Sequence, residues 1–528
     1  MKKSNEAHQR LAKIFGASTL ALLVMGCAST EVKTLQLPSA ERMQKACADL
    51  TGQTIAGVNV TKTERIAASA ITGGSALCRV SGTRAPFLDI EVVVPDQWSG
   101  RVFHQGGGGF DGRIPSSLTL NNSGEITTVH PAVSSKGAVF VSSNGGNRAT
   151  NPEQAGPGVW AKNTPEGNAS ADDYAYKALG KTIQFGKGVA KYFFASAPSK
   201  TYFNGCSNGG RGAYIVAQRW PQEYDGIVSG CQTMDMTGQT SAWVKVGSRA
   251  GTPAALSKEQ YQAAYSAAVN ACDAIDGLKD GYINNPAACN FDPAQLRCGL
   301  QTANADPKLC LSPEQIGTLQ LLMSDFKLSK GDTVYSKFNW SDFSGFGASF
   351  GALGGAYVML ATQDPSWMKA EKQAQFDLDT NYPQIGHGLN RKGLDNDKAA
   401  IAAYVASGKK LISWHANGDN LLSANDHLRN YATMTSLVKE LGIADPSENT
   451  RFFLVPTSTH SFGSLPQQVD WTSAIIDWVE KNQAPQQLTY TFTQAGASSP
   501  RSLPVCMNPK TPKYVSGDVN SASSYRCE

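Results

Sequence analysis

The chain has 528 residues, of which 41% are hydrophobic and 17% are charged, and its formal net charge is +4. Because this length exceeds that of a minimal domain, we expect one large domain with an insertion, or two domains. The charge is nearly balanced, and no long basic run follows the N-terminus, so nothing points to a nucleic-acid partner. The composition is that of a globular protein, and the 51 glycines indicate many tight turns.

The first 26 residues have the pattern of a signal peptide. Four basic residues precede an apolar run, Ile14–Met25, that is too short to span a bilayer comfortably. Residues 23–27, Leu-Val-Met-Gly-Cys, resemble a bacterial lipobox, which implies that Cys27 is the lipidated first residue of the mature chain. The alternative is an ordinary signal peptide whose cleavage site contains a cysteine. We therefore expect an exported lipoprotein, at the outer membrane or facing the periplasm, with a tether over residues 27–45 and membrane contact only through its anchor.

Strands alternate with helices along two separate parts of the chain. The hydrophobic pattern predicts strands at 87–95, 101–105, 138–142, 200–204, 224–230, 409–414 and 451–455, and helices at 171–195, 210–220, 426–441 and 474–481. Such alternation predicts an α/β fold with a mainly parallel sheet flanked by helices. The pattern breaks between the two parts, so we expect a core of residues 46–235 and 401–528, interrupted by an inserted lid at 236–400.

Residues 205–209, Gly-Cys-Ser-Asn-Gly, fit the nucleophile-elbow pattern Gly-x-Ser-x-Gly. They lie directly after a predicted strand and before a predicted helix, which is the context that this motif requires. The flanking glycines leave room for the sharp turn that exposes a serine hydroxyl. The motif alone also fits a glycine-rich turn that happens to contain a serine, but the strand–turn–helix context favours Ser207 as a nucleophile.

Acyl transfer also needs two backbone donors for the developing oxyanion. One donor should be the amide of Asn208, directly after the candidate nucleophile. The other should come from the loop Gly106–Gly109, which follows a predicted strand, and both Gly107 and Gly108 are candidates. A flexible glycine turn is the alternative; a phosphate-binding loop is disfavoured because no Lys-Ser/Thr pair follows.

The expected chain order of serine, acid and histidine selects the remaining catalytic residues. His460 follows the last predicted core strand by a few residues, where a general base is expected, although a structural surface histidine would also fit. Asp419 lies in the loop after the preceding strand and would orient the histidine. Asp426 is the nearest rival for the acid, but it precedes a helix and is better interpreted as an N-cap. We interpret the other nearby histidines, His415 and His427, as structural.

An acidic loop lies inside the predicted lid. Residues 272–283 contain Asp273, Asp276 and Asp280 together with two glycines. Carboxylate and carbonyl oxygens suit Ca²⁺, although the spacing is not that of an EF-hand. A solvated acidic turn is the alternative. We expect a structural calcium ion here.

Cysteine usage agrees with export. Eleven cysteines are present, and removal of Cys27 leaves an even ten, which in an exported chain suggests disulfides. Proximity in the sequence suggests the pairs Cys272–Cys289, Cys298–Cys310 and Cys506–Cys527, and we expect Cys47–Cys78 as a further pair. This leaves Cys206 and Cys231.

The elbow at 205–211, the glycine loop with the Phe-Asp-Gly that follows it, the acidic loop and the surroundings of Asp419 and His460 together resemble the tannase and feruloyl esterase family. The resemblance covers about residues 45–525. It implies an α/β-hydrolase core, a large lid and hydrolysis of esters of aromatic acids. It also implies calcium held by the side chains of Asp273, Asp276 and Asp280 and by the carbonyls of Leu278 and Tyr282.

The chain departs from this family at one cysteine. In the family, the cysteine before the serine usually bonds to a cysteine directly after the catalytic histidine, but here that position is Ser461. Cys231 is the cysteine left over, at the end of the next predicted strand. Neighbouring strands lie about 5 Å apart, within disulfide reach. We therefore predict the disulfide Cys206–Cys231, with a free thiol at Cys206 as the alternative.

These features together predict a secreted serine esterase that acts as a monomer on a small-molecule ester. An esterase for aliphatic or polyester-oligomer esters is the first alternative, because lid residues decide the substrate. A surface lipoprotein that binds a ligand without catalysis is the second. The intact serine, aspartate and histidine argue against this second alternative.

Overall fold

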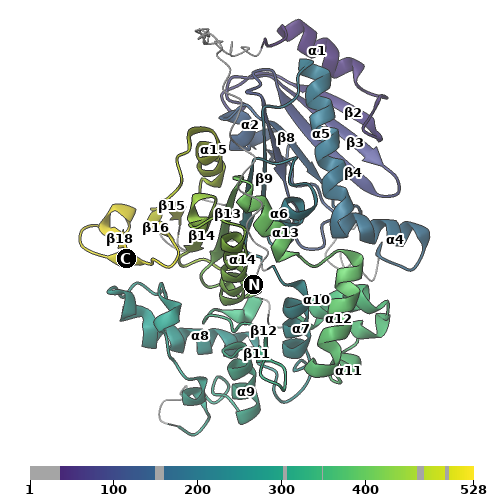
Figure 1. Ribbon diagram of the computed structural model, residues 1–528. Helices are drawn as coiled ribbons and strands as arrows, with labels where there is room; N and C mark the ends of the chain where they lie inside the picture. Colours follow the sequence, from purple (N-terminus) through teal and green to yellow (C-terminus); the bar gives the residue numbers. More distant parts are fainter. Residues whose placement is uncertain are drawn as a thin grey trace, which may run out of the picture. The chain divides into compact units, whose positions relative to one another are not determined.

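The centre of the main sheet is parallel (Figure 1). The computed structural model describes residues 36–148, 160–232, 234–300, 306–345, 347, 349–460, 469–493 and 499–528. The central strands, in spatial order, are β8 (Val139–Ser143), β5 (Arg101–Gln105), β9 (Lys200–Cys206), β10 (Gly226–Gly230), β13 (Lys410–Ala416) and β14 (Thr450–Val455). All of them correspond to strands predicted from the sequence.

Antiparallel strands extend this sheet on both edges. One edge carries β4 (Leu88–Pro95), β3 (Leu77–Arg84), β2 (Val58–Ile66) and β1 (Thr54–Ile55), and the other carries β16 (Arg501–Met507) and β15 (Gln487–Phe492). The described residues thus form a mixed sheet of twelve strands whose parallel part is the predicted core. Of the edge strands, only β4 was expected from the sequence.

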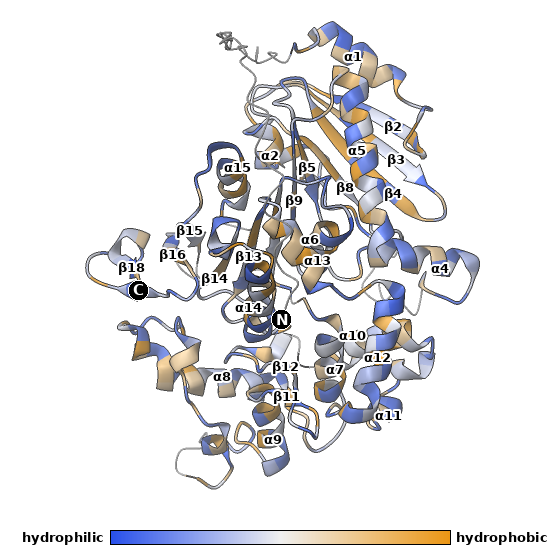
Figure 2. Ribbon diagram, in the orientation of Figure 1, coloured by the Kyte–Doolittle hydropathy of each residue, from blue (hydrophilic) through white to orange (hydrophobic). Residues whose placement is uncertain are grey.

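Helices cover both faces of the sheet. One apolar core lies between the sheet and α1 (Ala40–Asp49), α5 (Ala178–Phe194), α6 (Asn208–Arg219), α13 (Lys398–Ala406) and α14 (Ala424–Glu440). The other lies under α2 (Pro131–Ser134) and α15 (Trp471–Lys481). Because neighbouring strand residues point to opposite faces, Ile227 joins the first core and Val228 the second. Figure 2 accordingly shows β4 and β8 as largely hydrophobic.

The chain between β10 and β13 forms an insert whose apolar core also takes in Trp160, Tyr174, Leu421 and Leu422 from outside it. Helices α7 (Met236–Gly247), α10 (Phe350–Thr362) and α12 (Leu378–Lys392) pack side by side (Figure 1). The insert also contains α8 (Lys258–Cys272), α9 (Pro313–Leu322), α11 (Ala370–Gln373), β11 (Phe326–Lys327), β12 (Thr333–Tyr335) and short 3₁₀ turns at 273–276, 286–288, 293–296, 343–345 and 365–368. Residues Leu37–Glu528 form one compact unit, which includes this insert.

The remaining elements are short. They are β6 (Leu118–Leu120), β7 (Ile126–Val129), α4 (Pro165–Asp172), the π-helical turn Asp173–Lys177, β17 (Pro512–Tyr514), β18 (Tyr525–Cys527) and 3₁₀ turns at 446–448 and 522–524. Helix α1 begins at Ala40, inside the segment expected as a tether. Within the described ranges, no helix combines the length and the apolar character that crossing a membrane requires. Cys27 and the rest of the predicted signal peptide lie outside the described residues.

Four disulfides link the pairs predicted from the sequence. They are Cys47–Cys78, Cys272–Cys289, Cys298–Cys310 and Cys506–Cys527, with Cα–Cα distances from 4.9 to 5.9 Å. The first ties α1 to β3, and the last ties β16 to the C-terminal strand β18. The cross-links therefore fasten the edges of the sheet and the insert rather than its parallel centre.

Candidate active site

Ser207 occupies the sharp turn between β9 and α6. Its backbone angles, φ 59° and ψ −126°, are strained for a residue with a side chain. The turn is held because its N–H donates to the carbonyl of Gly230, 2.9 Å away. A Cβ atom at Gly205 would lie 2.4 Å from the backbone of Gly209, and one at Gly209 would lie 2.5 Å from the carbonyl oxygen of Gly107. The glycines of the motif are therefore required by close backbone contacts.

The three predicted catalytic side chains lie together at the carboxyl end of the parallel strands. Nε2 of His460, after β14, lies 2.9 Å from Oγ of Ser207. Nδ1 of the same ring lies 2.8 Å from Oδ2 of Asp419, after β13. His460 is 8% exposed and Asp419 only 2% exposed. One imidazole thus bridges a hydroxyl and a carboxylate in a site largely closed to water, which is the arrangement needed to move a proton from the serine.

The surroundings of Asp419 keep it ionised. Its Oδ1 accepts hydrogen bonds from the N–H groups of Leu421 and Leu422, each at 2.8 Å. Burial alone would raise the pKa of this carboxyl, but His460 and His415 outweigh burial and hold it well below its ordinary value. Burial conversely would lower the pKa of His460, yet the charge and hydrogen bond of Asp419 raise it. Each partner therefore favours the charged form of the other.

The glycine loop lies against the nucleophile turn, as expected for an oxyanion loop. A Cβ atom at Gly106 would meet the Cα of Gly209 at 2.9 Å, so the two backbones are nearly in contact. A Cβ atom at Gly107 would meet the Asp111 carboxylate at 2.9 Å, whereas one at Gly108 would meet nothing within 4 Å. Asn208 is the first residue of α6, where backbone amides favour an anion. Both glycines remain candidates for the second donor.

A buried polar network beside this loop was not predicted from the sequence. Asp111 accepts a 2.7 Å hydrogen bond from the Asn208 side chain, whose oxygen in turn accepts from Nε of Arg211 at 2.8 Å. Burial raises the pKa of Asp111 to about 6, although Asn208 and Arg211 counteract it. The Tyr174 hydroxyl lies 3.2 Å from the Asn208 oxygen and 2.6 Å from the hydroxyl of Tyr357 in α10. The network thus connects the oxyanion region to the insert. Asp111 directly follows the glycine loop, and this was the only available sequence signal.

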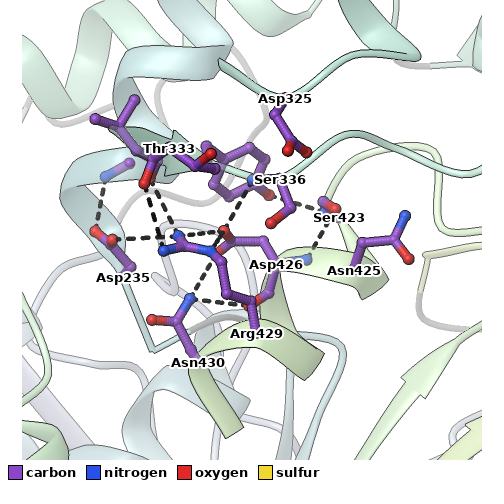
Figure 3. Close-up of polar contacts among 12 residues, drawn as sticks. Asp235, Asp325, Thr333, Ser336, Ser423, Asn425, Asp426, Arg429 and Asn430 are labelled. Carbon is purple, nitrogen blue, oxygen red and sulfur yellow. Dashed lines mark hydrogen bonds and ion pairs between the residues drawn. The ribbon is translucent and has the colours of Figure 1, made fainter. Parts of the chain in front are cut away.

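Asp426, the rival acid, attaches the insert to the core (Figure 3). Ser423 is the N-cap of α14, and Asp426 is the third residue of that helix. The Asp426 carboxylate accepts from the backbone N–H of Ser336 at 2.9 Å and pairs with Arg429 at 2.6 Å. Arg429 also donates to the carbonyl of Val334 at 3.3 Å. The N-cap interpretation of Asp426 is therefore wrong, because Ser423 supplies the cap and the aspartate holds β12.

A second carboxylate faces this cluster. Asp235 caps α7 by accepting from the Gly238 N–H at 2.7 Å. Burial, followed by the negative charges of Asp395 and Asp426, raises the pKa of Asp235 to about 7. Arg429 lies 3.9 Å away and is shared with Asp426. The attachment of the insert therefore contains more negative than positive groups.

The three predicted calcium ligands lie in one curled loop. Asp273 accepts from the backbone N–H groups of Asp280 and Gly281, both at 3.0 Å, and Asp276 accepts from Asn284 at 2.8 Å. Asp280 forms an ion pair with Arg501 of β16. Burial raises the pKa of Asp276 and of Asp280, and the charge of Asp273 adds to the effect in both. The loop thus gathers hard oxygen donors and negative charge, which fits a calcium ion chemically.

The two remaining cysteines lie at the ends of adjacent parallel strands. In the parallel register, Cys206 at the end of β9 is opposite Gly230, so Cys231 is the next residue along the neighbouring strand. Cys231 is buried, has a φ of 46°, and its sulfur lies within 4.8 Å of the ligand atoms of Asp419 and His460. The Cys206–Cys231 bond stays a prediction.

The chain is similar to several known esterases. It is 28% identical to the mono(2-hydroxyethyl) terephthalate hydrolase of Piscinibacter sakaiensis, over 88% of this chain and 87% of that protein. It is 26% identical to a probable feruloyl esterase of Arthroderma benhamiae, over 83% and 82% of the two chains.

Solved structures show the same fold. Feruloyl esterase B from Aspergillus oryzae superposes with a TM-score of 0.76 at 20% identity, covering 92% of this chain and all of that one. The tannin acyl hydrolase of Aspergillus niger gives a TM-score of 0.70 at 20% identity, over 93% and 96% of the two chains. Residues 69–528 match the family described as tannase and feruloyl esterase. The chain therefore belongs to the tannase and feruloyl esterase family and is a carboxylic ester hydrolase.

Proposed function

We propose that Ser207, His460 and Asp419 form the catalytic triad of a serine esterase. The observation that carries this proposal is the double contact of His460, whose two ring nitrogens lie 2.9 Å from the Ser207 hydroxyl and 2.8 Å from the Asp419 carboxylate. The strained turn at Ser207, at the end of a parallel strand and the start of a helix, supports the same assignment.

In this mechanism the Ser207 oxygen attacks the ester carbonyl while Nε2 of His460 takes the hydroxyl proton. Asp419 stabilises the resulting imidazolium. The oxyanion accepts hydrogen bonds from the N–H of Asn208 and from the N–H of Gly107 or Gly108. His460 then returns its proton to the leaving alcohol, which gives an acyl-enzyme. Water, deprotonated by His460, attacks this intermediate, and the carboxylic acid leaves as Ser207 regains its proton.

We further propose esters of aromatic acids, of the hydroxycinnamic or gallic type, as substrates. The names of the relatives support this class, and so do the aromatic side chains beside the oxyanion region. The rings of Phe110 and Tyr357 lie 5.4 Å apart, and those of Trp243 and Tyr357 lie 6.1 Å apart. Such rings can stack on an aromatic acyl group. An esterase for aliphatic or polyester-oligomer esters is the second candidate, which the same triad would serve.

One panel of substrates separates these two candidates. The purified protein should hydrolyse methyl ferulate, methyl gallate or a terephthalate monoester with a kcat/KM well above that for hydroxybutyrate oligomers. The reverse order would support the aliphatic candidate. A fluorophosphonate probe tests the remaining alternative, a ligand-binding protein without catalysis, because only a competent serine hydrolase becomes labelled at Ser207.

Calcium would support the insert rather than the chemistry. We propose that the side chains of Asp273, Asp276 and Asp280 and the carbonyls of Leu278 and Tyr282 hold it. The clustered carboxylates support this proposal. The bound ion would supply positive charge that neutralises the loop.

We also propose export, anchoring through a lipid on Cys27, and action as a monomer. The disulfides support an oxidising compartment. Metabolic labelling with radioactive palmitate tests the anchor, since Cys27→Ser should abolish incorporation. Light scattering of the protein without its anchor tests the oligomeric state.

A further inference from the structure

A line of buried polar side chains leads from Asp419 into the core, away from Ser207. Nε2 of His415, in β13, lies 3.1 Å from Oδ2 of Asp419. Nδ1 of His415 lies 2.8 Å from Nδ1 of His427 in α14. Nε2 of His427 contacts the hydroxyl of Tyr214 in α6, and that hydroxyl lies 2.8 Å from Oγ of Ser413. All five side chains are 2% exposed or less. Two consecutive elements, β13 and α14, and the distant helix α6 therefore build one connected series of hydrogen bonds behind the acid.

The chemistry of the first residue fixes the direction of every donor. Ionised Asp419 can only accept, so His415 must carry its proton on Nε2, the ring atom that faces Oδ2. The Asp419 carboxylate lies 3.1 Å from that atom, and Nε2 makes no full hydrogen bond to any other group of the described residues. Nδ1 of neutral His415 then accepts, and Nδ1 of His427 must donate to it. Nε2 of His427 accepts in turn from Tyr214, whose oxygen is left to accept from Ser413.

Burial supports single protonation of the inner ring. Desolvation, reinforced by the neighbouring His415, lowers the pKa of His427 well below its ordinary value. The ring packs against Phe452, whose centroid lies 4.7 Å away, and the titratable groups facing it are His415 and Tyr214. Those facing Asp419 are His460, His415 and Cys231. A neutral His427 has one donor and one acceptor, which is the combination that this series of hydrogen bonds requires.

We infer that His415, His427 and Tyr214 are positioning residues that orient Asp419 and draw part of its charge away from His460. The inference rests on the proposed triad. The opposite set of tautomers would turn a lone pair of His415 toward the carboxylate, which is repulsive. The far end is compatible with the first set, because the Tyr214 hydroxyl can donate to Nε2 of His427 while its oxygen accepts from Ser413. This series of hydrogen bonds therefore holds Asp419 in one orientation. It also limits how strongly Asp419 raises the basicity of His460.

Kinetics of His415 variants test this role. His415→Phe should lower kcat by about 10- to 100-fold, with little change in KM, because Asp419 loses its lateral support. The acid limb of kcat/KM, which reports His460, should move to higher pH because the carboxylate no longer shares its charge with His415. His415→Gln keeps a donor at the end of the side chain and should restore most of the activity. A fall in melting temperature with kcat and the acid limb unchanged would overturn the inference.

Tyr214, at the end of this series of hydrogen bonds away from Asp419, can be tested against a matched control. Tyr214→Phe removes the hydroxyl that faces His427. Tyr224→Phe removes an equally buried hydroxyl that lies 2.8 Å from Nδ1 of His104, elsewhere under the same sheet. We expect Tyr214→Phe to lower kcat several-fold, but to have no further effect on kcat once His415→Phe has cut the chain. Tyr224→Phe should leave kcat unchanged in both backgrounds. Equal effects of the two tyrosine variants, or an additive effect of Tyr214→Phe, would contradict a connected chain.

Nitrogen-15 NMR of labelled histidines reads the tautomers without any assay of activity. The wild-type protein should show His415 protonated at Nε2 only and His427 protonated at Nδ1 only. Tyr214→Phe should change the His427 signals and leave those of His104 unchanged. The opposite tautomers, or a doubly protonated His427, would refute the proposed direction of these hydrogen bonds. If the wild-type protein hydrolyses no ester, the proposed function fails on its own, and the tautomers still report on the chain.

Discussion

Arg501 of β16 forms an ion pair with Asp280 of the insert, and both side chains are less than a tenth exposed. The guanidinium therefore occupies one side of a carboxylate that is also a predicted calcium ligand. An arginine and a calcium ion attract the same oxygens and repel each other. The pair is thus either a substitute for the ion or a neighbour that weakens its binding.

This relationship gives a prediction about calcium. Calcium should raise the melting temperature of the wild-type protein, and a chelator should lower it, because a ligand of the folded state stabilises that state. Arg501→Gln should lower the melting temperature in chelator and increase the gain on adding calcium, since Asp280 loses its competing partner. Asp276→Asn should abolish the gain. Differential scanning calorimetry with and without calcium measures each effect.

The control for this series is Asp292→Asn. Asp292 lies in the same insert and caps a 3₁₀ turn through a 2.9 Å hydrogen bond from Ala294, outside the acidic loop. Its calcium response should equal that of the wild type. Metal analysis that finds no calcium in protein purified with the ion would contradict the site.

The nucleophile assignment gives the largest predicted effect. Ser207→Ala should reduce kcat by roughly 10⁴-fold or more while the fold is retained, because no other group can form the acyl-enzyme. Ser142→Ala removes another buried serine hydroxyl, on β8, which makes no hydrogen bond within the described residues. This control should keep wild-type activity. Labelling by a fluorophosphonate that persists in Ser207→Ala would show that another serine reacts.

Sequence patterns could predict those parts of the fold and site whose signal is local. The motif around Ser207, the glycine loop and the strands flanking Asp419 and His460 are each contained in a few consecutive residues. Apart from β4, the antiparallel edge strands were missed, although β2 alternates buried and exposed residues near its start. The chain from His415 through His427 to Tyr214 had no such signal. It depends on the packing of β13, α14 and α6, whose spacing in the sequence carries no information about contact.

The attachment of the insert should respond to pH through Asp235. Its pKa of about 7 lies above the ordinary value of 3.8. The folded state therefore holds a proton that the unfolded state has lost between these values. The bound proton therefore stabilises the folded state. Its contribution to the free energy of unfolding is complete below about pH 4 and disappears as the pH rises through 7. Asp235→Asn keeps the helix cap without the charge, so it should be more stable than wild type at pH 8, by about 2 kcal/mol, and differ less at pH 5.

Urea unfolding at pH 5, 6.5 and 8 with the disulfides intact measures this effect. Asp325→Asn is the matched control, because exposed Asp325 also accepts a backbone hydrogen bond in the insert, from Lys337 at 3.0 Å. This control measures the effect of removing a carboxylate at a backbone hydrogen bond outside the buried acidic cluster. A free-energy difference for Asp235→Asn that does not vary with pH would show that the carboxyl titrates normally.

The last prediction is the disulfide between Cys206 and Cys231. Apart from the predicted lipidation site Cys27, the four other pairs use every other cysteine of the predicted mature chain, and the register puts Cys206 directly opposite the neighbour of Cys231. A bond here would join two adjacent strands beside Ser207 and stiffen the strained turn. It would take the place of the link between the nucleophile turn and the histidine loop that Ser461 precludes. The enzyme should therefore lose activity under reducing conditions that leave the more distant Cys47–Cys78 bond intact.

Peptide mapping without reduction decides the pairing directly. We expect one cross-linked peptide that contains both cysteines, and no alkylation of either residue before reduction. The double variant Cys206→Ala/Cys231→Ala should have the lowered activity of the reduced enzyme and be insensitive to mild reductant, whereas Cys506→Ala/Cys527→Ala should retain the wild-type sensitivity. Recovery of Cys206 as an alkylatable thiol, or linked to any other cysteine, would disprove the bond. In that case a thiol would lie beside the catalytic serine, and hydrogen peroxide should inactivate the enzyme in proportion to oxidation of Cys206.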